Sequence, residues 1–266
     1  MRHSWTRAAT MAVAAVIALT VGACGSDTPA SGPSAGATSA GVTGEVHVFA
    51  AASLTESFTQ IGKDFEAANP GSKVIFNFAA SSALATQINQ GAPADVFAAA
   101  SPATMKTVTD AGNGEGTPVT FVKNQLVIAV PKGNAKGIAG LSDLTKPGLK
   151  VALCAEQVPC GAAAKKALDA AGVKLTPVTL EQDVKAALAK VKLGEVDAAL
   201  VYRTDAKSAT SDVDGIEFPE SAGATNDYPI IALKNGLNTA GAQAFLAYVR
   251  SDKGKSVLAQ TGFQAP

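Results

Sequence analysis

The sequence predicts an α/β fold with parallel-rich sheets flanked by helices, and three observations lead to this prediction. Strand-like and helix-like segments alternate along residues 45–266, as is typical of parallel strands joined by helical crossovers. This stretch of roughly 220 residues is long enough for one large domain or two domains of ordinary size. The chain shows no short-period internal repeat, which argues against a solenoid or a propeller.

The individual elements follow from local patterns in chain order. Runs of β-branched and apolar residues predict strands at 45–50, 73–78, 95–99, 126–130, 150–153, 198–202 and 228–233. Helical patterns occur at 54–68, 83–90, 103–111, 161–171, 183–193, 239–251 and 254–260. Gly172 and Gly194 stand where two of these helices should stop.

The N-terminal segment predicts export. Arg2 and Arg7 form a basic region, and the mostly apolar run 8–23 that follows is too short for a comfortable membrane span. Val-Gly-Ala then precedes Cys24, which resembles a bacterial lipobox, where the cysteine takes a lipid and becomes the mature N-terminus. We expect residues 1–23 to be a lipoprotein signal peptide and Cys24 to be lipidated; an ordinary signal peptide with a chance cysteine is the alternative.

The segment after Cys24 is expected to be a tether. Residues 25–44 are almost wholly Gly, Ser, Ala, Thr and Pro, and such a segment cannot bury enough apolar surface to fold. Twenty flexible residues span about 25 Å on average. We therefore expect residues 24–44 to hold a folded part, starting at Glu45, against the outer face of the cell membrane.

Composition excludes several classes of function. Loss of Arg2 and Arg7 leaves 22 − 2 = 20 basic residues against 22 acidic ones, and no Lys/Arg-rich tract indicates nucleic acid. Outside the signal segment the single histidine is His47, in a predicted strand, which rules out a His-rich metal site. A Ser-His-Asp triad also lacks its Gly-x-Ser-x-Gly motif. We expect neither enzyme activity nor a cofactor.

Two strand-to-helix turns carry small hydroxyl residues that could meet an anion. Ligands of parallel sheets bind beyond the carboxyl ends of strands, where helix N-termini offer free N–H groups and a partial positive charge. Ser53 stands in one such turn, and Ser81 with Ser82 in another. Hydroxyl and amide donors together suit a tetrahedral oxyanion. Each serine could equally be a simple helix cap, and Glu56 would complete a capping box with Ser53.

Further short motifs occur in a consistent order along the folded part. They are Val-Phe-Ala-Ala-Ala-Ser-Leu at 48–54, Ser81-Ser82, Gly-Ala-Pro-Ala-Asp-Val-Phe at 91–97, Val-Pro-Cys-Gly at 158–161, Asp183-Val184, Val201-Tyr202 with Asp205, Tyr228-Pro229 and Gly262-Phe263. Each motif alone is weak, but together they are consistent over the whole segment. In this respect the chain resembles the periplasmic molybdate-binding proteins of ABC transporters.

The resemblance implies an architecture that periodicity does not give. It is a two-lobe periplasmic-binding-protein-like fold of type II, in which two crossing segments join α/β lobes that close on a ligand. We expect lobe 1 to comprise residues 45–123 plus 232–266 and lobe 2 to comprise residues 124–231. The crossings are expected near 124–128 and 227–231.

The resemblance also implies the molybdate-binding residues, position by position. Ser53 and Ser81 match two serines that give hydroxyl and backbone donors. Cys160 and Val184 match backbone N–H donors, and Tyr202 matches a tyrosine whose hydroxyl completes the site. Cys160 departs from the small residue that the family often has, but only its main chain is implied in binding. Molybdate or tungstate would thus be held through its oxygens, with no direct metal ligands from the protein.

The remaining cysteines and acids receive structural roles. With Cys24 lipidated, Cys154 and Cys160 are the pair left for a disulfide in an oxidising compartment; two free buried thiols are the alternative. A thiol–disulfide enzyme is a remote alternative, because such enzymes favour Cys-x-x-Cys spacing. Asp95 and Asp205 are expected to be structural, because a bare carboxylate facing a dianion would repel it.

The expected partners follow from these assignments. They are the molybdate or tungstate anion, the permease and ATPase of an ABC importer, and the membrane through the Cys24 lipid, for a monomeric protein. The nearest alternative is a receptor for another tetrahedral oxyanion such as sulfate, which also needs only hydrogen-bond donors. Phosphate receptors that accept a protonated ligand need an acceptor as well, and the implied site offers none.

Overall fold

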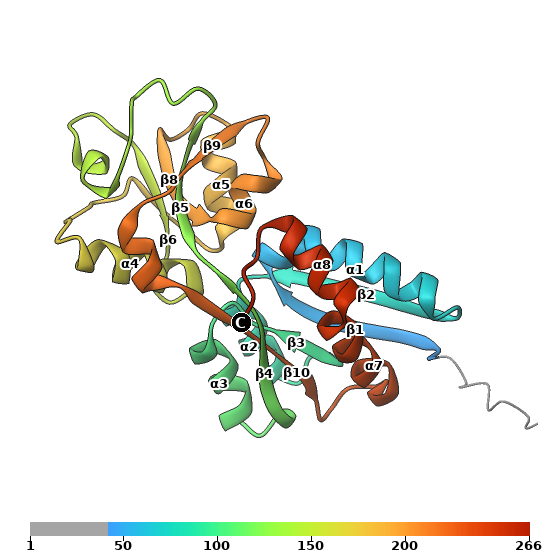
Figure 1. Ribbon diagram of the computed structural model, residues 1–266. Coiled ribbons are helices and arrows are strands. Elements are labelled where there is room, and N and C mark those ends of the chain that lie inside the picture. Colours follow the sequence, from blue (N-terminus) through green and yellow to red (C-terminus); the bar gives the residue numbers. More distant parts are fainter. Residues whose placement is uncertain (1–41) are drawn as a thin grey trace, which may run out of the picture. The chain divides into compact units, whose positions relative to one another are not determined.

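The computed structural model describes residues 42–266, which contain two five-stranded sheets with helices around each (Figure 1). The first sheet has the order β2-β1-β3-β10-β4, with β1 (Gly44–Ala51), β2 (Ser72–Ala79), β3 (Val96–Ala98), β4 (Gly114–Asn124) and β10 (Asn226–Leu233). The second has the order β7-β6-β8-β5-β9, with β5 (Leu126–Pro131), β6 (Val151–Cys154), β7 (Thr179–Glu181), β8 (Ala198–Tyr202) and β9 (Val213–Ile216). The predicted signal peptide, Cys24 and the tether up to residue 41 lie outside the described residues.

The strand directions confirm a parallel-rich α/β fold. In the first sheet β1 is parallel to β2 and β3, while β10 is antiparallel to β3 and β4. In the second sheet β6 is parallel to β7 and β8, while β5 is antiparallel to β8 and β9. Each sheet is therefore mixed: four strands run one way, and one strand, β10 or β5, runs against them.

Helices flank both sheets in a repeated strand-to-helix pattern. Around the first sheet lie η1 (Ala52–Leu54), α1 (Thr55–Ala68), α2 (Ser81–Asn89), α3 (Pro102–Asp110), α7 (Thr239–Arg250) and α8 (Asp252–Thr261). Around the second lie η2 (Leu141–Thr145), α4 (Pro159–Ala170), α5 (Val184–Lys192), α6 (Arg203–Ser208) and η3 (Pro219–Ala224). Strands β1, β2, β3, β6, β7 and β8 each run into a helix, so helix starts collect at the carboxyl edges of both sheets.

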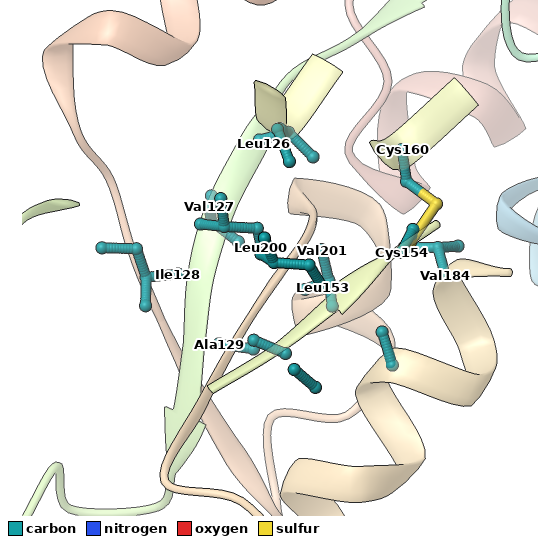
Figure 2. Packing of buried hydrophobic residues seen from close by; sticks show 14 of the residues in the cluster. Leu126, Val127, Ile128, Ala129, Leu153, Cys154, Cys160, Val184, Leu200 and Val201 are labelled. Carbon is teal, nitrogen blue, oxygen red and sulfur yellow. A yellow bond between two sulfur atoms is a disulfide. The ribbon is translucent and has the colours of Figure 1, made fainter. Parts of the chain in front are cut away.

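Apolar side chains fill each sheet's faces and also link the two sheets. Phe58 and Phe65 of α1 pack edge-on against Phe245 of α7, with ring centres 5.9 and 5.5 Å apart. The core of the second sheet, part of which Figure 2 shows, extends to Ala52 and Ala80 at the helix starts of the first sheet. The two carboxyl edges therefore share one apolar cluster.

The chain passes between the sheets at two places. It leaves the first sheet at Gln125, between β4 and β5, and returns at Thr225, between η3 and β10. Residues 227–231, where we expected the second crossing, instead lie inside β10, because this strand pairs with β3 and β4. The division of the chain into the two lobe ranges stays a prediction. Within residues 42–266 no helix has the length and apolar character needed to cross a membrane.

Candidate functional site

A small cavity lies where the carboxyl edges of the two sheets meet. Its volume is about 20 Å³, somewhat more than the roughly 10–15 Å³ that one water molecule needs. The first sheet contributes residues that follow β1, β2 and β3, and the second sheet contributes residues at or after the ends of β6, β7 and β8. The lining consists of Ala51, Ala52, Ser53, Ala80, Ser81, Ala100, Val158, Pro159, Cys160, Asp183, Val184 and Tyr202. A cavity of this size suits a compact ion and excludes a large organic ligand.

The structure brings all five sequence-predicted site residues to this one cavity. Ser53 and Ser81 come from the first sheet, and Cys160, Val184 and Tyr202 come from the second. None of the five is more than 3% exposed. Ser82, the neighbour of Ser81, is not among the lining residues.

Among the described residues, three of the helix starts at the cavity lack side-chain caps. Residues Ala51, Ala80 and Val158 occupy the cap positions of η1, α2 and α4, and their apolar side chains accept no hydrogen bond. By contrast α3, α7 and α8, whose cap residues do not line the cavity, are capped by Ser101, Asn238 and Ser251. Because the first N–H groups of a helix have no intrahelical partner, uncapped starts leave donors free for a ligand.

Helix α5 is the exception, because Asp183 caps it. Asp183 Oδ1 accepts from the Ala186 N–H at 2.9 Å, deeper in the first turn. This bond engages the carboxylate that lines the cavity and leaves the Val184 amide, at the first helical position, for a ligand. One oxygen of this carboxylate is thus engaged by the helix that it caps.

The Ser81 hydroxyl is oriented by a backbone donor. Ser81 is the first residue of α2, and its Oγ accepts from the Ala100 N–H at 2.9 Å. With that lone pair occupied, the hydroxyl hydrogen is available to a ligand. Of the two sequence interpretations for Ser81, the structure rules out a cap, because the cap position of α2 is Ala80.

The Ser53 hydroxyl contacts a second buried hydroxyl. Ser53 Oγ lies 2.8 Å from Tyr228 Oη. The capping-box interpretation of Ser53 with Glu56 is wrong, because Ser53 lies inside η1, where its hydroxyl meets Tyr228, and Glu56 pairs with a lysine. Tyr228 was singled out in the sequence only as a motif landmark.

Tyr202 lines the cavity at the end of β8. Its Oη accepts from Asn226 Nδ2 at 2.9 Å. Burial, and then the neighbouring Tyr228, raise the pKa of Tyr202 well above its ordinary value. Burial raises the pKa of Tyr228 as well. Both phenols therefore keep their hydrogens and can donate them at any physiological pH.

Cys160 lies at the start of α4 and is joined to Cys154 by the expected disulfide (Figure 2). The two cysteines are 2% and 3% exposed. The bond ties the end of β6 to the helix start, across the turn that carries Val158 and Pro159. Gly161 allows the same turn to close tightly, because a Cβ there would collide with the Ala155 carbonyl. The Cys160 amide is thus held by covalent and steric constraints.

A charged cluster beside the cavity spans the two sheets. Lys185 Nζ of α5 lies 2.7 Å from Glu56 Oε1 of α1 and 3.1 Å from Asp205 Oδ1 of α6. Asp205 is fully buried, and its Oδ2 accepts from the Tyr202 N–H at 3.1 Å. Asp205 Oδ1 forms an ion pair with Lys185 but accepts no hydrogen bond from the residues that the structure describes.

The two aspartates assigned to structure have partners in the protein. Asp205 holds the start of α6, as described. Asp95 accepts from the N–H groups of His47 and Asn238, both at 2.7 Å, so it ties β1 to the loop before α7. Neither carboxylate lines the cavity. No cluster of three or more potential metal-binding side chains occurs among the described residues.

Comparison with known proteins places the chain in a family. A sequence model of bacterial extracellular solute-binding proteins matches residues 46–264. The chain belongs to this family. The molybdate-binding protein ModA of Mycobacterium tuberculosis is 46% identical over 265 residues, which cover 98% of this chain and 99% of that protein. This solute-binding protein is accordingly an extracytoplasmic transport component and not an enzyme.

Solved structures confirm the fold of this solute-binding protein. The periplasmic molybdate-binding protein of Azotobacter vinelandii aligns with a TM-score of 0.72 at 19% identity, covering 83% of this chain and 99% of that one. The sulfate-binding protein SubI of Mycobacterium tuberculosis aligns with a TM-score of 0.70 at 18% identity, covering 83% and 86%. Proteins with different anions thus share the architecture, so the ligand has to be argued from the cavity.

Proposed function

We propose that this protein captures molybdate, and also tungstate, in the cavity between its sheets and delivers it to the permease and ATPase of an ABC importer. The observation that carries the proposal is the convergence of uncapped helix starts and buried hydroxyls from both sheets on one cavity of about 20 Å³. The 46% identity to a molybdate-binding protein over nearly the whole chain supports the choice of anion.

The donors in this proposal are neutral. They are the hydroxyls of Ser53, Ser81 and Tyr202 and the amides at the helix starts, including those of Cys160 and Val184. None of the lining residues in the described part of the chain is Lys or Arg. Hydrogen bonds to a charged acceptor contribute about 1.5–3 kcal/mol each, and helix-end partial charges add to them in a dry site. A rigid set of donors also selects for anion size, because donors placed for a larger oxyanion reach a smaller one poorly.

Titration calorimetry with molybdate, tungstate, sulfate and phosphate tests the proposal. We expect the first two to bind and to raise the melting temperature by several degrees, since ligand at 100 times its Kd adds about 2.7 kcal/mol. The affinity should fall only weakly with salt, unlike binding through exposed cations. Equal shifts from sulfate and molybdate would leave only a general oxyanion receptor, the nearest alternative. The burial of both cysteines argues against the thiol–disulfide enzyme, which needs an accessible sulfur.

We also propose that the protein acts as a monomer, held at the membrane by a lipid on Cys24, and that the two lobes move as units when the cavity opens, with residues 227–231 staying in the first sheet as part of β10. The lipobox-like residues before Cys24 support the anchor. A Cys24→Ala variant should leave the membrane fraction and appear as soluble protein. Retention of that variant in the membrane fraction would rule out the lipid as the anchor.

A further inference from the structure

Two buried asparagines lie side by side where the chain passes between the sheets, behind the hydroxyls of the cavity. Asn124 ends β4 and Asn226 begins β10, and the two are direct partners across this antiparallel strand pair. They are 1% and 8% exposed. Neither lines the cavity, and neither was singled out from the sequence.

Backbone groups fix which way each amide faces. Asn226 contacts the Ala100 carbonyl at 2.6 Å; a carbonyl can only accept, so the NH₂ group of Asn226 must face it. The same NH₂ group then donates to Tyr202 Oη at 2.9 Å. Asn124 is fixed at its other end, because its Oδ1 accepts from the Gln125 N–H at 3.0 Å. Its NH₂ group therefore faces Thr204 Oγ1, at 2.9 Å, and Tyr228 Oη, at 3.4 Å.

These directions determine what the hydroxyls can do. A tyrosine hydroxyl that accepts from an asparagine has its single hydrogen left to donate onward. Tyr202 is then left with one hydrogen, which a ligand in the cavity can accept. Ser53 Oγ and Tyr228 Oη lie 2.8 Å apart, so Tyr228, which accepts from Asn124, can donate to Ser53 and leave the Ser53 hydrogen for the cavity. Ser81 Oγ likewise accepts from the Ala100 N–H, so the Ser81 hydrogen is also left for the cavity.

We propose that Asn124 and Asn226 are positioning residues that make the cavity hydroxyls donor-only, and that they thereby favour a fully deprotonated oxyanion over one that still carries a hydrogen. This proposal rests on the proposed function. An anion with no hydrogen accepts from every hydroxyl. A protonated anion such as hydrogen phosphate brings a hydrogen that needs an acceptor, and hydroxyls held in the donating direction offer none; a buried donor without a partner is costly. The carboxylate that lines the cavity, Asp183, already accepts from the Ala186 N–H through Oδ1.

A double-mutant cycle tests whether Asn226 acts through Tyr202. Molybdate affinity is measured by calorimetry for wild type, Asn226→Ala, Tyr202→Phe and the double variant. We expect Tyr202→Phe to weaken binding about 10- to 100-fold, Asn226→Ala to weaken it about 3- to 10-fold, and the double variant to bind as Tyr202→Phe does. If the affinity losses of the two single variants instead multiplied in the double variant, Asn226 would act independently of the Tyr202 hydroxyl, and the inference would be overturned.

A parallel cycle with Asn124→Ala and Ser53→Ala tests the relay through Tyr228 in the same way. Asn69→Ala is the matched control, because Asn69 also donates from Nδ2 to a backbone carbonyl, at the far end of α1. Its affinity should equal that of wild type. Thermal melting without ligand verifies that each variant folds.

Competition by two anions of similar size tests the selectivity. Sulfate and phosphate are each titrated against bound molybdate at about pH 8.5, where both are dianions but phosphate carries one hydrogen and sulfate carries none. We expect competition by phosphate relative to sulfate to rise in Asn226→Ala, because the freed Tyr202 hydroxyl can then rotate and accept. No rise would overturn the donor-only inference. Failure of wild-type protein to bind any tetrahedral oxyanion would instead contradict the proposed function.

Discussion

At the scale of single residues, the site depends on hydroxyl groups that accept hydrogen bonds from other groups of the protein, which leaves their own hydrogens for a ligand. Ser81 accepts from Ala100, and Tyr202 accepts from Asn226, so each keeps a hydrogen for the anion. A serine at a helix start would ordinarily cap that helix. Here the cap positions are alanine or valine, which leaves the serine hydroxyls for binding.

Replacing either serine should therefore weaken binding without unfolding the protein. We expect Ser53→Ala and Ser81→Ala each to weaken molybdate binding about 10- to 100-fold, measured by calorimetry. Ser82→Ala is the control, since Ser82 follows Ser81 in α2 but does not line the cavity. If both serine variants bound molybdate as wild type does, and replacing a lysine with alanine abolished binding, a cation rather than the hydroxyls would hold the ligand.

Asp205 should make stability depend on pH in an unusual direction. Burial raises the pKa of Asp205 to about 6, against the lowering effect of Lys185; Glu56 raises it further, and the Tyr202 N–H lowers it. The ordinary value is 3.8. The folded state thus holds a proton more tightly than the unfolded state, so stability attributable to Asp205 increases as pH falls through about 6 toward 4 and is lost as pH rises.

Comparison with Asp205→Asn, which does not titrate, isolates this effect. We expect the unfolding free energy of wild type minus that of the variant to rise between pH 8 and pH 5, measured by denaturant melts at each pH. A difference that stays constant, or that falls toward pH 5, would show that the ion pair with Lys185 outweighs burial and keeps Asp205 ionised in the folded protein.

At the scale of elements, the turn between β6 and α4 positions the backbone N–H of Cys160, a donor of the candidate site. The Cys154–Cys160 disulfide and the tight approach at Gly161 both restrict this turn. In the chain-entropy view, a crosslink over so short a loop contributes only about 2.4 kcal/mol to stability. Its larger effect should be on the position of the Cys160 amide, because an uncrosslinked turn has more conformations to lose when the ligand binds.

A Cys154→Ala/Cys160→Ala variant separates the crosslink from the amide. We expect the unfolding free energy to fall by about 2 kcal/mol and molybdate binding to weaken only a few-fold, since the amide at position 160 remains. Denaturant melts and calorimetry measure the two effects. A loss of affinity as large as that of Ser81→Ala would mean that the sulfurs themselves contribute to the ligand site.

At the scale of the whole described chain, one exposed ion pair joins helices of different sheets beside the cavity. Lys185 of α5 contacts both carboxylate oxygens of Glu56 on α1, at 2.7 and 2.8 Å. Lys185 directly follows Val184, whose amide is proposed to bind the anion. Closure of the cavity and formation of this ion pair should therefore occur together.

Glu56→Gln should speed ligand release. Because partly exposed ion pairs contribute up to about 1 kcal/mol, we expect molybdate to dissociate up to about 5-fold faster, measured by stopped-flow exchange against tungstate. Glu195→Gln is the control, since Glu195 pairs with Lys190 of the same helix α5 and joins no second sheet. Equal dissociation rates in the two variants would exclude Glu56 from closure.

Much of the fold and the two serine turns of the candidate site could be predicted from local patterns in the sequence, whereas Cys160, Val184 and Tyr202 were implied only by the resemblance to a family. Long amphipathic helices such as α1 and strands such as β1 leave periodic signals, and the small hydroxyl residues stand in recognisable turns. Strands β7 and β9 and helix α6 went unpredicted, because three to six residues are too few to show a period. Strand β4 was missed because its start, Gly-Glu-Gly-Thr-Pro at 114–118, reads as a loop.

Tertiary structure alone decided which groups stand behind the site and where the chain returns to the first sheet. Asn124 and Asn226 are about a hundred residues apart in sequence, and their importance comes from facing the same strand pair and two tyrosine hydroxyls. The Glu56–Lys185 pair and the reversed direction of β10 are likewise long-range. Local sequence specifies backbone propensity and capping, whereas the direction of a hydroxyl hydrogen depends on the neighbours that only folding brings within hydrogen-bond distance.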